Sequence, residues 1–484
     1  MPRLTPAIIE QNINEINEPE MQKLRNEDIR RDWIYHGKIL EVVYEAILRE
    51  FKKPETIVEL KNRMIPINIV QKIINKLAMV YKSAPMRKAA DGNEDDNELI
   101  QIYEDGLNIN RCMKSANRHF KLYKRALVEM YLGEKGVPSM RALRRGTYEV
   151  FSSSAIDPQI PDTVLKILKW DHDETKRVFE WWTDQDFLIT NGKGVPLRFQ
   201  MEEMGNPTGV NPYGVLPFQY INESDTDLIP LPDDDLLKVG IAIPLLLSDV
   251  AFASKYQAWS MIYTVGVDGD IPINPNSVVN LEFGPQGERP EINTIKPDID
   301  TESQLRFVEA VVAFLLSTKN LNAGSIQGKL TTQNAASGIA KMLDNAESME
   351  DREDQQQYFI DAEKEIWEKL AHKMIPYWRQ KRLLDGDFNA EFSKEFELSI
   401  HFPEIKIIKT EMERLNESLF RIEKGFSTLK RELKKLYPDA SEDELDALID
   451  EINQEKMDKL KLVADSMQPM DGDVDENDSE ETEE

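Results

Sequence analysis

The most constraining feature of the sequence is a pair of long apolar helical patterns separated by a segment rich in glycine and proline. The first pattern runs from Pro232 to Tyr263, and the second runs from about Thr301 to Ser317. Both have the apolar spacing of a helix. The segment between them contains short apolar runs among Gly and Pro, which indicates a small β module. The fold must therefore accommodate two long helices joined through a β module.

Three aspartates, Asp233, Asp234 and Asp235, stand at the start of the first helical pattern. Carboxylates stabilise the positive end of a helix, so helix capping is the favoured interpretation and a divalent-ion site is the alternative. Pro244 lies inside the pattern and predicts a kink or a later start. Counted from Asp233, a helix rising 1.5 Å per residue would be roughly 46 Å long.

Further helical patterns lie on both sides of this pair. In the N-terminal part, apolar periodicity predicts helices over 26–51, 66–81 and 97–131. A polar loop over 318–334 precedes the longest pattern, 335–381, which would extend about 70 Å and should kink near its polar run EDREDQQQ. Two more helices are expected at 409–436 and 441–467, on either side of Pro438.

Between residues 133 and 231 the helical period gives way to short runs of β-branched and aromatic residues. These runs occupy 147–152, 163–170, 175–183 and 186–190. The loop DHDE between the second and third runs predicts antiparallel neighbours. A mainly antiparallel β region between helical regions indicates the α+β class and not a doubly wound sheet.

The charge of the chain limits its partners. The 484 residues include 60 Lys and Arg against 88 Asp and Glu, a formal net charge of −28. The segment 471–484 holds nine acids and no base, so we expect a disordered tail there. An acidic body binds nucleic acid poorly without sequence specificity, because such binding depends on Lys and Arg displacing counterions from phosphates.

The cysteine content and the length of the apolar runs indicate in which cellular compartment the chain is made. The one cysteine, Cys112, excludes an internal disulfide framework and a Cys-rich zinc module. The longest apolar run, 239–247, is shorter than the roughly 20 residues of a membrane span. The N-terminus lacks the basic and apolar regions of a signal peptide. We therefore expect no transmembrane helix and synthesis in the cytoplasm.

Sequence motifs of enzymes fail on spacing. The segment GSIQGKLT at 324–331 has three residues between its glycines where a phosphate loop has four, and Leu follows its lysine. Asp162 and Glu174 mimic a magnesium-nuclease pattern, but a hairpin would place them roughly 25 Å apart. The five histidines are scattered and form no HExxH motif. We expect no catalytic residue, no cofactor and no metal.

Four passages, taken in order, resemble the portal proteins of tailed double-stranded DNA bacteriophages. Each motif is weakly specific by itself, but their order and spacing match the family over most of residues 30 to 400. The passages are PINIVQKIINKLAMVYKSAP (66–85), NPYGVLPFQYIN (211–222), the helix, β module and helix of 233–317, and TTQNAASGIAKMLDNAESMEDREDQQQYF (331–359) with the loop before it.

The resemblance implies a mainly helical portal fold with an antiparallel β-rich wing. Its parts would be a wing over 1–231 that is helical to 132 and β-rich from 133, a first stem helix (232–264), a clip (265–299), a second stem helix (300–317), a tunnel loop (318–334), a long kinked helix with the return to the wing (335–404), a helical crown (405–468) and a disordered acidic tail (469–484).

The resemblance also implies a function. Portal proteins form a dodecameric ring at one capsid vertex of the virion, the channel through which double-stranded DNA is packaged and ejected. The implied partners are the large terminase subunit, the head-tail adaptor and the major capsid protein, with no membrane. Two alternatives remain open: a nuclease-like, DNA-processing phage enzyme and a monomeric helical scaffold protein.

By the resemblance, the loop 318–334 rims the narrowest part of the channel. Its neutral polar residues, among them Asn322 and Gln327, suit such a place, and its only charges are Lys319 and Lys329. In a ring each lysine would become a circle of positive charge that holds phosphates briefly. We expect Lys329 to lie nearer the tip of the loop than Lys319. A surface loop with solubilising lysines is the alternative.

Overall fold

The computed structural model describes most of the chain. The chain divides into two compact units. One unit comprises Met1–Ala335 and Leu343–Ile405, and the other comprises Ala336–Met342 and Lys406–Glu484. The described residues are 4–50, 57–58, 61–62, 64–258, 261–265, 291–295, 300–321, 338–403, 418–436, 441, 444–454 and 457.

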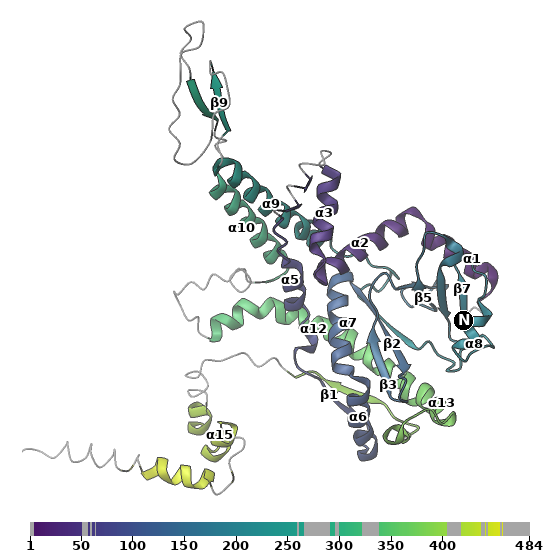
Figure 1. Cartoon of the computed structure of the whole chain (residues 1–484). Helices are drawn as coiled ribbons and strands as arrows, with labels where there is room; N and C mark the ends of the chain where they lie inside the picture. The colour runs from purple at the N-terminus through teal and green to yellow at the C-terminus, as the bar shows by residue number, and fades with distance from the viewer. Residues whose placement is uncertain are drawn as a thin grey trace, which may run out of the picture. The chain divides into compact units, whose positions relative to one another are not determined.

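The first unit mixes helices with antiparallel sheets (Figure 1), as expected for the α+β class. Three of its N-terminal helices begin with a side-chain cap, from Thr5, Asn68 and Asn93; Asn68, for example, accepts a hydrogen bond from the backbone N–H of Gln71. The N-terminal helices are α1 (Pro6–Asn17), α2 (Pro19–Tyr35), α3 (Ile39–Glu50), α5 (Ile69–Leu77), α6 (Glu94–Leu107) and α7 (Ile109–Tyr123), with a 3₁₀ turn at Val80–Lys82.

Three predicted helix boundaries in this region are wrong. The pattern over 26–51 is two helices, because Gly37 has a φ of +89° and turns the chain between α2 and α3. The helix predicted over 66–81 ends at Leu77. The helical assignment of 125–131 fails, because Lys124 ends α7 in a left-handed conformation and β2 (Arg125–Leu132) follows.

The β-rich region contains two sheets. A three-stranded sheet has the order β3-β2-β8, and a four-stranded sheet runs β4-β5-β6-β7, with every neighbour antiparallel. The hairpin predicted around the loop DHDE is confirmed as β5 and β6. The strands are β3 (Pro138–Ala142), β4 (Tyr148–Phe151), β5 (Thr163–Lys169), β6 (Val178–Trp182), β7 (Phe187–Asn191) and β8 (Phe218–Asn222), with the short helix α8 (Arg198–Glu203) after β7 and a 3₁₀ turn at Glu174–Lys176.

The two long apolar helices are α9 (Asp234–Ala258) and α10 (Thr301–Thr318). They lie side by side, and strands β9 (Met261–Val265) and β10 (Glu291–Ile295) form an antiparallel pair at their far end (Figure 1). The predicted order of helix, β module and helix is therefore confirmed for the described residues. The first helix ends before Tyr263, which belongs to β9.

The parts of α9 and α10 that lie away from β9 and β10 are buried against α2, α3, α5 and α7 in one apolar cluster. Gly240 permits this packing, because a Cβ there would lie 2.4 Å from a methyl carbon of Val70 on α5. Pro244 is accommodated inside α9 and does not delay its start. The carbonyl of Pro244 accepts a hydrogen bond of 2.6 Å from the Ser248 hydroxyl one turn later.

The longest helix, α12 (Gly338–Lys369), packs with α6, α7 and the strand β2 around the largest apolar cluster of the first unit. Its helical residues continue through the polar run EDREDQQQ, and the kink expected there stays a prediction. A π-helical turn follows at Leu370–Met374, before α13 (Ile375–Gln380). Pro376 explains the turn, since its ring clashes with the carbonyl four residues earlier in a regular α-helix.

After α13 and a 3₁₀ turn (Gly386–Phe388), the chain returns as β11 (Leu398–His401), which pairs antiparallel with β1 (Met86–Ala89). In the second unit the described helical residues are 338–342 at the start of α12, 418–423, α15 (Leu429–Leu436), 444–454 and 457. The division into wing, stem, clip, tunnel loop and crown stays a prediction, and the tail at 469–484 lies outside the described residues.

Candidate functional sites

Lys319, the first lysine of the predicted channel loop, lies at the C-terminal end of α10 in an ion-pair cluster. Its Nζ is 2.6 Å from Asp233 Oδ2 and 3.0 Å from Asp235 Oδ2, at the start of α9. Only 12% of its side chain is exposed. The ammonium of Lys319 is therefore neutralised by carboxylates of the same chain.

Lys124 joins the same cluster from the C-terminus of α7. Its Nζ is 3.1 Å from Asp233 Oδ1 and 3.3 Å from Glu223 Oε2. Burial disfavours the charge on Lys319, but its hydrogen bonds to Asp233 and Asp235 outweigh this effect and raise its pKa. Burial likewise opposes ionisation of Asp233, yet Lys319 and Lys124 lower its pKa overall. The cluster thus fixes the point where the loop leaves α10.

The aspartates at the start of α9 serve this cluster and the helix end. The Asp235 carboxylate also accepts a hydrogen bond of 2.6 Å from the backbone N–H of Leu236, in the first turn of α9. Throughout the described part of the chain, no group of three His, Cys, Asp or Glu residues is placed to hold a metal ion. Asn322, Gln327 and Lys329 lie outside the described residues, so their channel role stays a prediction.

The nuclease-like pair is separated as the hairpin argument predicted. Asp162 directly precedes β5, where it accepts hydrogen bonds from Ser153 and Thr163. Glu174 precedes β6, the antiparallel partner of β5, so the two carboxylates stand at opposite ends of the hairpin. They cannot share one metal ion. The loop GSIQGKLT at 324–331 lies outside the described residues.

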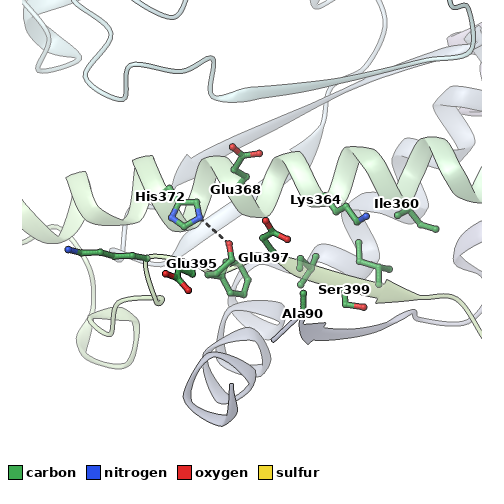
Figure 2. A pocket seen from close by; sticks show the side chains of 12 residues that line it. Ala90, Ile360, Lys364, Glu368, His372, Glu395, Glu397 and Ser399 are labelled. Carbon is green, nitrogen blue, oxygen red and sulfur yellow. Dashed lines mark hydrogen bonds between the residues drawn. The ribbon is translucent and has the colours of Figure 1, made fainter. Parts of the chain in front are cut away.

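A groove of about 540 Å³ lies between one face of α12 and the segment that leads into β11 (Figure 2). Ile360, Lys364, Glu368 and His372, spaced four residues apart, line its helical wall. His372 Nε2 lies 3.1 Å from the carbonyl oxygen of Phe396, the contact drawn in Figure 2. This contact joins the end of the helical wall to the segment that leads into β11.

An apolar stripe on α10 was not anticipated from the sequence. Phe314 is 73% exposed and Phe307 is 58% exposed, whereas Val308, Val312, Leu315 and Leu316 are buried against the neighbouring helices. The two phenylalanines are seven residues apart, so they share one face of the helix. The signal was present in the sequence, because α10 carries more apolar residues than one buried face requires.

One helix of the described chain, over Asp234–Ser254, is long and apolar enough to cross a membrane, with a mean hydropathy of 1.9 and 33% of the segment buried. The longest unbroken apolar run, 239–247, had led us to expect no membrane-spanning helix. A single helix of this kind is weak evidence for a span, since core helices of globular proteins have the same composition. Its contacts with α10, α3, α5 and α2 cover only part of this apolar surface.

Comparisons with known proteins do not define a family. No protein-family model matches the sequence, and no curated protein matches it. Among solved structures, the chain is similar to one chain of the virion of a native gene transfer agent particle, with 12% identity, a TM-score of 0.38, and 78% of this chain and 92% of that chain covered. A chain from the neck of an empty gene transfer agent particle gives 14% identity, a TM-score of 0.37 and the same coverage. Similarity at these scores carries no argument about this chain.

Proposed function

We propose that this chain is the portal protein of a tailed, phage-like particle, a structural ring subunit and not an enzyme. The observation that carries the proposal is the helix pair α9 and α10, which ends in the β9–β10 pair and has an apolar stripe open to solvent. Large exposed apolar side chains in register on one helix are typical of a surface that another copy covers.

Ring geometry supports this assignment. Twelve helices about 10 Å wide, placed side by side in a circle, leave a central bore of roughly 28 Å. A DNA duplex about 20 Å across passes through such a bore with a hydrated gap. The net charge of −28 suits a conduit, because a channel must not hold the phosphates of the duplex tightly.

In this proposal the finer roles follow the resemblance given above. The ring sits at one capsid vertex and contacts the major capsid protein. The β module between the stem helices receives the terminase during packaging and the head-tail adaptor afterwards. The loop with Asn322, Gln327 and Lys329 faces the DNA, while Lys319 anchors the base of the loop to α9.

Deleting residues 266–290, between the paired strands β9 and β10, tests the proposed role of the β module in binding terminase and the adaptor. The shortened chain should still form rings, because α9 and α10 remain, but it should no longer bind terminase or support packaging. DNA packaging at the parental level would contradict the assignment of this segment as the clip. Loss of the ring itself would show that the segment, and not the helix pair, makes the subunit contacts.

A further inference from the structure

Among the described residues, strand β8 pairs with β2 along one edge and with no strand along the other. Its ladder with β2 is fixed by backbone hydrogen bonds from Glu223 to Lys124 and from Met130 to Pro217. Because antiparallel pairs alternate, the backbone groups of Phe218, Tyr220 and Asn222 point away from β2. Among the described residues no strand pairs with these groups.

Two side chains reach part of this edge. Lys369 Nζ donates to the Phe218 carbonyl oxygen at 2.9 Å, and the Gln219 amide donates to the Tyr220 carbonyl oxygen at 3.3 Å. The backbone N–H groups of the edge receive no such partner among the described residues. An edge of this kind is a template for another extended chain.

The edge lies in a groove of about 390 Å³ with two different walls. One wall is α12, through Tyr358, Asp361 and Glu365. The other is the loop 159–161, where the side chain of Ile160 is 56% exposed. Successive side chains of a strand added to β8 would point alternately toward these two walls.

The helical side of the groove is acidic. Asp225, Asp361 and Glu365 are exposed there. The one lysine of the lining, Lys369, is bonded to β8 and also lies 3.8 Å from Glu365 Oε2, so it offsets part of the charge of Glu365 but pairs with neither Asp225 nor Asp361. The pKa of Tyr358 is raised by burial and then by the carboxylates of Asp225 and Glu223, so negative charge is concentrated at this wall. An occupant with Lys or Arg directed toward α12 would complement that charge.

We propose that this groove docks an extended, basic segment of a partner protein, which adds to the sheet as a strand beside β8. The segment alternates apolar side chains, which pack on Ile160, with basic side chains, which face Asp361 and Glu365. Backbone hydrogen bonds to the edge supply affinity, and the two walls supply specificity.

The test uses the purified full chain and a short fluorescent peptide of alternating Val and Lys. Fluorescence anisotropy should show saturable binding. A peptide with Glu in place of Lys should bind at least tenfold more weakly. A Val/Lys peptide that is N-methylated on the residues facing the edge should also lose at least tenfold, because it cannot donate to the Tyr220 or Asn222 carbonyl oxygens.

Asp361→Lys should weaken binding of the Val/Lys peptide about tenfold. Glu368→Lys is the matched control, because it makes the same charge change on α12 but lines the other groove. Circular dichroism verifies that both variants fold. No binding, equal binding of the N-methylated peptide, or an equal loss in both variants would each overturn the proposal. So would peptide binding to dilute chain only and not to assembled rings, since a second copy would then occupy the groove.

Discussion

His119 on α7 is a fully buried histidine whose charge the fold excludes. Burial lowers its pKa to about 4, against the weaker opposing effect of Asp32, while His36, Arg144 and Arg118 lower it further. Its Nδ1 has no hydrogen-bond partner among the described residues. The folded chain therefore binds a proton at this site less readily than the unfolded chain does.

This depressed pKa makes stability depend on pH. The stabilisation is complete above the unfolded pKa of about 6.5 and is lost as the pH falls toward 4, to a total of about 3 kcal/mol. Denaturant unfolding between pH 7 and pH 4 should show this loss. His119→Leu should reduce it, whereas the same change at the exposed His172 should not. An unchanged pH profile in His119→Leu would contradict the assignment.

The two lysines of the channel loop should behave differently on substitution. Lys319→Ala should lower the free energy of unfolding by about 1 kcal/mol. The substitution removes two ion pairs, to Asp233 and Asp235, whose carboxylates are partly exposed. A double-mutant cycle with Asp233→Asn measures the coupling. Zero coupling energy would show that the cluster does not hold the end of α10.

Lys329→Glu should leave both stability and ring assembly intact but impair DNA packaging or retention. The reason is that a circle of positive charge in the channel would be replaced by negative charge, which repels phosphates. Genome length in purified particles is the measurement. If the variant packages and retains full-length genomes as the parent does, the channel role of Lys329 is wrong even where the portal assignment stands.

At the scale of elements, the exposed stripe of α10 is expected to be a subunit contact. Replacing Phe307 and Phe314 with Lys should prevent ring assembly and leave a folded monomer, because neither side chain supports the core of its own chain. Sedimentation velocity with circular dichroism separates these effects. Leu383→Lys, at an exposed apolar residue outside α10, is the control and should leave assembly unchanged. Normal rings from the double variant would place the contact elsewhere.

Helices and strands were predicted best where the apolar periodicity and the residues that bound an element agree. The β5–β6 hairpin and the helix pair α9 and α10 were found from runs of eight or more residues bounded by Gly, Pro or acidic clusters. The prediction failed at β2, whose residues are almost all buried. A strand buried on both faces has a continuous apolar pattern, which cannot be told from a helical segment by period.

Contacts between residues far apart in the sequence could not be predicted from local sequence patterns. The pairing of β1 with β11 joins residues 86–89 to 398–401, and no local pattern specifies such a partner. Lys319 directly follows α10, where the loop was predicted to begin, but its partners Asp233 and Asp235 lie more than eighty residues away along the chain. The sequence therefore indicated the candidate loop but not which of its charges is already used.

At the scale of the whole molecule, the acidic segment 471–484 should be dispensable for assembly. It has nine acids and no base, so it can neither join an apolar core nor form a compact unit. A chain ending at Met467 should form the same oligomer, measured by light scattering. Loss of the ring on truncation would show that the tail takes part in subunit contacts.

The particle mass in solution, measured without detergent and followed by negative-stain imaging down the symmetry axis, tests the central claim most directly. Twelve copies of the 55.8 kDa chain predict a mass of about 670 kDa and a ring with an open central channel. A stable monomer of 55.8 kDa would favour a helical scaffold protein. A requirement for detergent would assign the apolar surface of α9 to a membrane, and either result would contradict the account.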